Sequence, residues 1–300
     1  MPHSAIQKIE TLANQYRVDD GRHFRLKDLD PEDTADLQSK EKATELLTSG
    51  VQRLSEMQEK LYAQDRWALL LIFQAPDAAG KDGTIKHVMS GINPQGCQVT
   101  SFKTPSSTEL GHDFLWRTTV ALPERGRIGI FNRSYYEEVL VIRVHPELLQ
   151  NQRIPDSLVT KRIWDERFED INGFEKHLSR NGVVIRKFFL HVSRKEQKAR
   201  FLKRLREPQK NWKFSASDLR ERNYWEDYMR AYEEMIRNTT TSHAPWYAVP
   251  ADNKWVTRII VASIVIETLQ SLNLHFPEVT PDQKKQIDHA RESLSSEAEQ

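Results

Sequence analysis

The residues from Ala75 to Thr84 are of the types that bind phosphate. They read Ala-Pro-Asp-Ala-Ala-Gly-Lys-Asp-Gly-Thr, after the apolar run 68–73 and before a stretch with helical spacing. Backbone N–H groups at the start of a helix bind phosphate oxygens, and a lysine ammonium neutralises charge that moves between phosphates. The loop therefore predicts a phosphate site formed by Ala78, Ala79, Gly80, Lys81, Asp82 and Gly83.

The loop departs from the usual Gly-x4-Gly-Lys-Ser/Thr pattern at two positions. Ala75 stands at the first glycine, and Asp82 stands where a hydroxyl normally contacts magnesium. A carboxylate in the loop can hold the ion instead or orient the nucleophile, so we assign both roles to Asp77, with Mg2+ or Mn2+ as cofactor. The alternative is an ordinary strand-to-helix turn, in which Gly80 is only a turn residue and Lys81 is solvated.

A second set of candidates follows the apolar run 128–131. In enzymes with a phosphate loop, the neighbouring strand usually ends in an aspartate that contacts magnesium. This chain has Asn132, which offers a neutral oxygen but cannot act as a general base. Arg133 comes next and can bind a phosphate through two N–H groups, although a surface arginine is an alternative. We predict that Asp77, Lys81 and Arg133 form the catalytic set.

Charge is unevenly spread along the chain. The net charge is only +1, which argues against a surface devoted to nucleic acid, yet the segment 186–213 holds eleven basic residues and two acidic ones. An anionic partner explains such a run, and so does a solvated helix face. No apolar stretch approaches the roughly 20 residues that span a bilayer. We expect a soluble, cytoplasmic protein with no membrane or nucleic-acid partner.

Apolar runs alternate with helical stretches through most of the 300 residues. Runs that are apolar throughout are typical of parallel strands covered on both faces, and the alternation predicts a doubly wound α/β sheet. The expected strands are 68–73, 98–102, 128–131, 183–192 and 246–249. The expected helices are 43–61, 83–91, 108–121, 157–179, 195–207, 217–237 and 255–269.

Both ends of the chain differ from this pattern. Residues 1–38 show little periodicity, which predicts an irregular arm lying on the body. Residues 276–300 are charged and nearly devoid of large apolar side chains, which predicts a frayed helix or a disordered tail. Residues 39–275 then form the main domain.

Several separate motifs resemble the polyphosphate kinase 2 family, in particular its class III branch. They are the run 74–89 around the loop, Asn-Pro-Gln-Gly at 93–96, Phe-Asn-Arg-Ser-Tyr-Tyr-Glu at 131–137, Trp-Lys-Phe-Ser at 212–215, Tyr-Met-Arg-Ala-Tyr-Glu-Glu at 228–234 and Ala-Pro-Trp-Tyr at 244–247. The resemblance implies a three-layer P-loop fold similar to thymidylate kinase, with a helical lid around 195–225. It also implies Mg2+-dependent, reversible phosphoryl transfer from inorganic polyphosphate to AMP and ADP.

The same resemblance implies roles for particular residues. The essential loop aspartate and lysine of the family are Asp77 and Lys81 here. Asn132 stands where other classes have aspartate, and Glu137 falls on the acidic position associated with the use of monophosphates, so both are assigned to the acceptor nucleotide. The family's lid arginine corresponds to Arg200 or Arg204. Phosphate or polyphosphate contacts are expected from Arg133, Arg200, Arg204 and Lys210.

The resemblance further suggests guanine nucleotides as substrates beside AMP, ADP and ATP, and a homo-oligomer. Two other functions stay open from the residues. One is a nucleoside monophosphate kinase that uses ATP as donor. The other is a P-loop module that binds nucleotide or nucleic acid without turnover, which salt-sensitive DNA or RNA binding would indicate.

Overall fold

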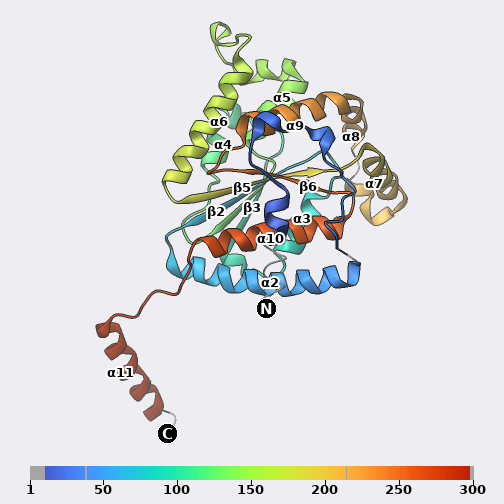
Figure 1. Cartoon of the computed structure of the whole chain (residues 1–300). Helices are drawn as coiled ribbons and strands as arrows, with labels where there is room; N and C mark the ends of the chain where they lie inside the picture. The colour runs from blue at the N-terminus through green and yellow to red at the C-terminus, as the bar shows by residue number, and fades with distance from the viewer. Residues whose placement is uncertain (1–10, 38, 214, 298–300) are drawn as a thin grey trace.

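The computed structural model describes residues 11–37, 39–213 and 215–297, and its centre is a six-stranded sheet (Figure 1). The strand order is β1-β6-β5-β2-β4-β3; every pairing is parallel except that of β1 with β6. The strands are β1 (Arg17–Val18), β2 (Ala68–Gln74), β3 (Cys97–Ser101), β4 (Ile128–Asn132), β5 (Val183–His191) and β6 (Trp246–Pro250).

The central strand β2 is buried along its whole length. Because successive side chains of a strand point to opposite faces, Leu69 and Leu71 belong to one apolar cluster while Leu70 and Ile72 belong to another. Each face of the sheet must therefore be covered by helices. This arrangement explains why the run is apolar throughout rather than alternating.

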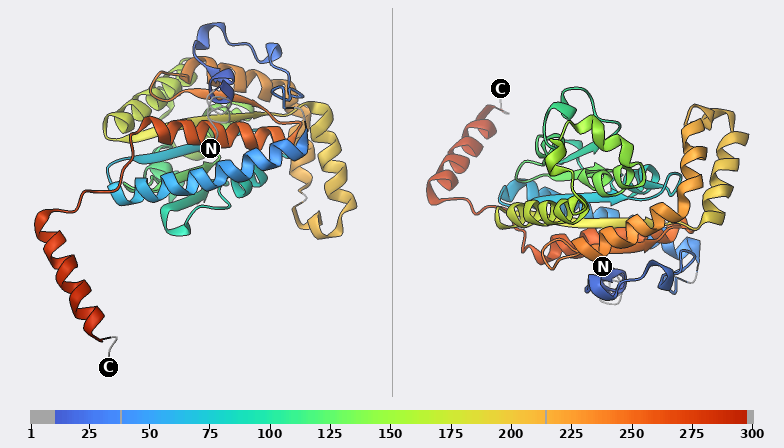
Figure 2. Two further views of the ribbon diagram at one scale, coloured as in Figure 1. Left: turned by 60° about the horizontal axis from the view of Figure 1, so that its bottom comes forward. Right: turned by 90° about the horizontal axis from the view of Figure 1, so that it is seen from above.

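Helices cover the two faces in separate layers (Figures 1 and 2). One layer contains α2 (Lys40–Gln64), α3 (Lys81–Val88) and α10 (Lys254–Ser271), with α10 packed on both other helices. The opposite layer contains α6 (Ile163–Arg180) and α9 (Trp225–Thr239), which pack together. The predicted three-layer α/β fold with a largely parallel sheet is confirmed.

Shorter elements complete the chain. The remaining helices are α4 (Trp116–Thr119), α5 (Val141–Val144), α7 (Arg194–Arg206), α8 (Ala216–Glu221) and α11 (Pro281–Glu297). The 3-10 helices are η1 (Gly21–His23), η2 (Leu26–Asp28), η3 (Pro94–Gly96), η4 (Glu109–Gly111), η5 (Tyr135–Val139), η6 (Pro146–Gln152), η7 (Asp156–Leu158), η8 (Pro208–Lys213) and η9 (Arg222–Tyr224). Figure 2 shows α7 and α8 rising together from one end of the sheet.

The predicted helix 108–121 is wrong over most of its length. Only η4 and the short α4 form there, because polar side chains bond the local backbone and compete with a helix. Ser106 N donates to Glu109 Oε2 at 2.6 Å, and Leu115 N donates to Asp113 Oδ1 at 2.9 Å. The predicted helix 217–237 is likewise divided into α8 and α9 by η9.

The N-terminal arm contains a strand that periodicity did not predict, and the tail forms a helix, one of its two expected alternatives. Within the arm, β1 adds an antiparallel edge strand to the sheet, with Arg17 opposite Tyr247. At the other end, α11 is a regular helix that stands away from the body, and none of its side chains is buried (Figure 1). Residues 1–10, 38 and 298–300 of the predicted arm and tail lie outside the described residues.

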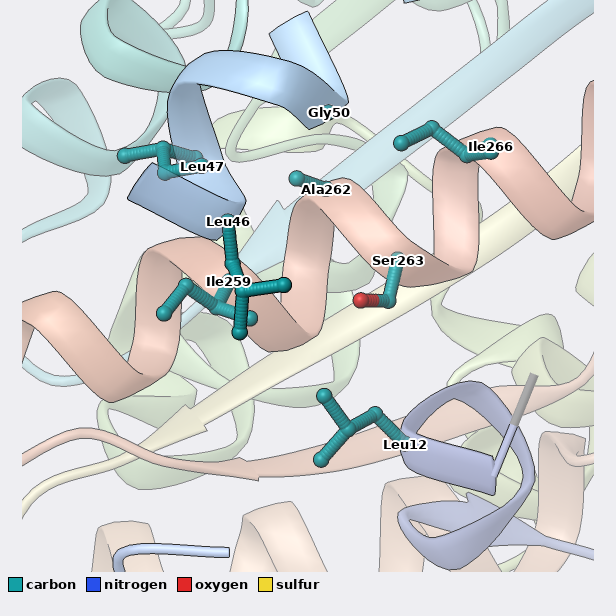
Figure 3. Close-up of a pocket in the computed structure, with 8 residues that line it drawn as sticks. All are labelled: Leu12, Leu46, Leu47, Gly50, Ile259, Ala262, Ser263 and Ile266. Carbon is teal, nitrogen blue, oxygen red and sulfur yellow. The ribbon is translucent and has the colours of Figure 1, made fainter. Parts of the chain in front are cut away.

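A small apolar cavity lies between the N-terminal segment, α2 and α10 (Figure 3). Leu12, Leu46 and Ile259 are among the side chains that surround it, and it contains a single hydroxyl, that of Ser263. Such a space is a gap between packed helices rather than a site for a charged substrate. Among the described residues, no helix is both long and apolar enough to cross a membrane.

Candidate active site

A cleft of about 1010 Å3 opens at the carboxyl ends of β2 and β4. The loop 77–84 forms its floor, and Asn132 and Arg133 enter from the end of β4. Side chains of α7, α8 and α10 form one wall, and residues 101–104 after β3 form another. The structure thus gathers the loop and strand-end candidates of the sequence in one place.

The loop backbone has the conformation of an anion-binding turn. Ala78 has φ +61° and Gly80 has φ +107°, both in the left-handed region, and α3 begins immediately afterwards at Lys81. Gly80 is the N-cap of α3, and no side chain caps the amides of the first turn. Successive backbone N–H groups in such a turn, at the positive end of a helix dipole, attract phosphate oxygens.

Helix α7 holds this loop from behind through Arg200. Its Nη1 donates to Ala78 O at 3.2 Å and to Ala79 O at 2.5 Å, and its Nη2 donates to Ala251 O and Asp252 O at 2.6 and 2.9 Å. Its Nε donates to Glu196 Oε1 at 2.8 Å. The guanidinium predicted as a phosphate ligand therefore has its donors occupied by protein acceptors and supports the loop.

Lys81 lies buried beneath the loop. Its ammonium donates to Ala75 O at 2.7 Å. Burial, followed by the nearby Arg133 guanidinium, lowers the pKa of Lys81, and the carboxylates of Asp77, Glu137 and Asp82 oppose that shift. The structure therefore places a cation among carboxylates at the floor of the cleft, which disagrees with the simple-turn alternative.

Arg133 adopts an unusual backbone conformation for a residue with a side chain. Its φ is +65°, and its N–H donates to Phe73 O at 3.0 Å, which ends the ladder between β2 and β4. Its Nη2 forms an ion pair with Asp77 Oδ1 at 2.9 Å. The Glu137 carboxylate raises the pKa of the Arg133 guanidinium, with a further contribution from Asp77. Arg133 thus links two of the predicted acidic residues.

Glu137 lies on η5, one turn after the strand end. The Ser134 hydroxyl accepts from Tyr136 N at 3.2 Å and so begins the 3-10 turn that brings Glu137 towards Arg133. Burial raises the pKa of Glu137, while Arg133 and Lys81 lower it. Burial raises the pKa of the Tyr232 phenol on α9, and the Glu137 carboxylate raises it further.

Three oxygen-bearing side chains line the floor of the cleft and suit a hard cation. Asn132 Nδ2 donates to Asp82 Oδ1 at 2.8 Å, and Asp77 lies across the same floor. Among the described residues, no cluster of three or more histidine, cysteine, aspartate or glutamate side chains could hold a metal alone. Mg2+ commonly takes one or two carboxylates together with waters and substrate phosphates, so these residues fit it.

The wall of the cleft is basic, and sequence reasoning found only part of it. Arg204 lines it as predicted and pairs with Asp218 of α8 at 3.2 Å. Lys210 lies in η8, and its side chain is outside the described part of the structure. Lysine and arginine side chains that the sequence analysis did not select are Lys103, Lys203, Lys254 and Arg258.

The spacing of the last two of these residues in the sequence could have identified them. Lys254 and Arg258 are four residues apart at the start of α10, so they project from one helix face. Burial lowers the pKa of Lys254, and neighbouring Arg200 and Lys203 lower it further. Like charges gathered at this end of the cleft indicate a place for a polyanion.

A parallel sheet whose central strand leads into a phosphate-binding loop at the start of a helix defines a P-loop phosphotransferase. Within that class, this chain belongs to the polyphosphate kinase 2 family, whose sequence profile matches residues 37–277.

Relatives and solved structures agree with this assignment. The chain is 55% identical over 288 residues to an ADP-polyphosphate phosphotransferase of Rhodopseudomonas palustris, covering 96% of this chain and 99% of that protein. It is 43% identical over 265 residues to an AMP/ADP-polyphosphate phosphotransferase of Meiothermus ruber, covering 88% and 95%. The crystal structure of polyphosphate kinase 2 from Arthrobacter aurescens TC1 superposes with a TM-score of 0.84 at 39% identity, covering 93% of this chain and 96% of that chain.

Proposed function

We propose that this protein transfers the terminal phosphoryl group of inorganic polyphosphate to ADP and AMP, and catalyses the reverse reactions. The observation that supports it most is the cleft itself, where a phosphate loop and the Asp77–Arg133 pair meet a basic wall. A chain of phosphates carries about one negative charge per unit, and such a wall neutralises it as nucleic-acid grooves do. Relatives named as polyphosphate phosphotransferases support the same reaction.

In the proposed reaction, an oxygen of the acceptor phosphate attacks the terminal phosphorus of polyphosphate in line with the bond that breaks. Lys81 and Arg133 stabilise the charge that spreads over the transferred oxygens. Asp77 orients the acceptor through its ion pair with Arg133. Asp77, Asp82 and Asn132 would provide oxygens for Mg2+. The ion, when bound, neutralises phosphate charge.

Glu137 is the residue we assign to recognition of the acceptor. It stands beside Arg133 at the edge of the site, and burial raises its pKa. A carboxyl group there can bind an acceptor directly or through the metal. Glu137→Gln should change the ratio of AMP to ADP turnover by about tenfold, since one charge-assisted hydrogen bond is worth about 1.5 kcal/mol.

The acceptor range, assembly and location of the protein complete the proposal. We propose that guanine nucleotides are accepted, that the protein is a homo-oligomer, and that it acts in the cytoplasm. Replacing ADP by GDP in the assay tests the first statement. Light scattering after size-exclusion chromatography tests the second, and cell fractionation tests the third.

The deciding experiment mixes purified protein with Mg2+, long-chain polyphosphate and either AMP or ADP, with no other nucleotide. We expect ADP from AMP and ATP from ADP, resolved by chromatography, with both products lost in Lys81→Met and on chelation of the metal. Turnover of AMP only when ATP is supplied would instead identify an ATP-dependent monophosphate kinase. Salt-sensitive binding of DNA or RNA with no turnover would identify a binding module.

A further inference from the structure

Gln197 is a buried glutamine on α7 whose two amide atoms contact different parts of the site. Its Nε2 donates to Asp77 O at 3.0 Å, in the loop. Its Oε1 accepts from Arg222 Nη1 at 2.7 Å, at the junction of α8 and α9. The side chain is 4% exposed, so neither contact competes freely with water.

The orientation of this amide follows from its partners. A backbone carbonyl only accepts hydrogen bonds and a guanidinium only donates them, so Nε2 must face Asp77 O and Oε1 must face Arg222. A glutamine that merely filled space would need no such pair. Gln197 is therefore matched chemically to the loop on one side and to the lid on the other.

Gln197 and Arg222 both lie in the segment 195–225 that was expected to form the lid, Gln197 on α7 and Arg222 in its outer part, α8 and η9, which we call the lid here. Arg222 lies in η9, directly after α8, and its Nη1 also donates to Arg194 O at 3.0 Å. Helix α8 carries Asp218, which pairs with Arg204. Burial raises the pKa of Asp218, with a further contribution from the Asp77 carboxylate. Asp218 and Asp77 both line the cleft, so α8 faces the loop.

Gln197 and Arg200 are three residues apart on one face of α7. Together they bond the carbonyls of three consecutive loop residues, Asp77, Ala78 and Ala79. These bonds, together with that from Ala79 N to Pro76 O at 3.2 Å, fix the backbone conformation of the loop. Any shift of α7 is thus passed to the backbone that carries the Asp77 carboxylate.

We infer that Gln197 is a positioning residue that couples the lid, through Arg222, to the placement of Asp77 for phosphoryl transfer. The inference rests on the proposed polyphosphate-dependent reaction. A phosphate chain that contacts Lys203 or Arg204 acts on the same helix, α7, so its binding and the geometry of the loop are linked. Misplacement of a reacting group by a fraction of an ångström is enough to slow transfer substantially.

The test separates the two contacts of Gln197. Gln197→Glu keeps an oxygen that accepts from Arg222, but its second carboxylate oxygen faces Asp77 O and cannot donate to it. Only the hydrogen bond to the loop is therefore lost. We expect kcat with ADP and polyphosphate to fall about tenfold, with KM for polyphosphate changed less than about threefold. Arg222→Met removes the contact of Gln197 with the lid, together with the bond from Arg222 to Arg194 O, and should lower kcat in the same way. Wild-type kcat in Gln197→Glu would overturn the inference.

A matched control measures the cost of losing any buried glutamine amide. Gln58 is 1% exposed on α2, away from the cleft, and its buried Oε1 has no hydrogen-bond partner. Gln58→Leu should therefore leave kcat unchanged, whereas Gln197→Leu should reduce kcat. The double variant Gln197→Leu/Arg222→Met should be no slower than Gln197→Leu alone, because one link is broken in both. Additive losses of kcat in the double variant would contradict coupling. So would a loss of kcat in Gln58→Leu equal to that in Gln197→Leu. An inactive wild type would instead refute the proposed function.

Discussion

Burial of the Lys81 ammonium lowers the stability of the fold. Its side chain is 9% exposed, and its ammonium has a carbonyl as hydrogen-bond partner. Burial lowers its pKa below the usual 10.5 despite three carboxylates nearby. Between the folded-state pKa and 10.5 the unfolded chain binds more protons, so this group makes stability rise with pH in that window. Its charge is retained for catalysis rather than for stability.

Lys81→Met should therefore lower activity without lowering stability. We expect kcat to fall about 100- to 1000-fold, because the cation that faces the transferred phosphoryl group is lost. The melting temperature should equal or exceed that of wild type below the folded-state pKa, and the gain should shrink as pH approaches 10.5. Calorimetry at several pH values checks this, and a clear loss of stability at neutral pH would show that the carboxylates need the lysine.

Gly80 is required for its backbone conformation rather than for space. A methyl group there would meet Arg200 Nη1 at 3.6 Å, an ordinary contact, but φ of +107° is strained for any L side chain. Gly80→Ala should destabilise by about 1–2 kcal/mol and lower kcat. Gly173→Ala is the control, because Gly173 lies inside α6 with open space around it and should gain about 0.5–1 kcal/mol. Equal melting temperatures of the two variants would refute the argument.

At the scale of elements, a buried ionic network joins the sheet to the layer of α6 and α9. Lys187 of β5 donates to Glu175 Oε2 at 2.6 Å and to Thr239 O at 2.7 Å. Glu175 Oε1 accepts from the hydroxyls of Tyr135 and Tyr136 at 2.8 and 2.7 Å. These tyrosines belong to η5, so the network also holds the turn that carries Glu137.

Breaking this network on one side should be costly. Lys187→Met leaves the Glu175 carboxylate buried without its cation, and we expect a loss of about 3–5 kcal/mol, or a melting temperature lower by roughly 6 °C or more. Lys187→Met combined with Glu175→Gln removes both charges and should recover most of the loss. Urea titration of both variants measures it. A double variant no more stable than Lys187→Met would show that the cost arises from packing instead.

At the scale of the whole molecule, α11 is separate from the catalytic body. It follows an irregular stretch, residues 272–280, after α10, and none of its side chains is buried. An isolated helix of this length is marginal in water, and no buried side chain of α11 stabilises this helix. Ile287 and Leu294, seven residues apart, lie on one exposed face.

Removal of residues 277–300 should leave a single chain equally stable, because no buried contact is lost. We expect kcat with ADP within about twofold of wild type and a melting temperature within about 1 °C. The oligomeric state should be measured in the same samples by light scattering. A parallel loss of assembly and activity would contradict independence of the body and show that α11 acts between copies.

Local pattern determined much of this protein. Apolar runs predicted the strands β2, β4, β5 and β6, and the less apolar segment 98–102 predicted β3. The order of strand, loop, Gly80-Lys81 and helix predicted the phosphate site. The three-layer fold followed because buried parallel strands need helices on both faces. These features depend on residues near one another in the chain, which periodicity and turn chemistry describe.

Contacts between distant residues were decided only by the tertiary structure. Sequence could not assign Arg200 to the loop carbonyls, since its partners at Ala78 and Ala251 lie far away in the chain. The pairing of β1 with β6 and the bond from Gln197 to Asp77 also join segments that lie far apart in the chain. A polar side chain has several possible partners of equal chemistry, and packing of the whole chain selects among them.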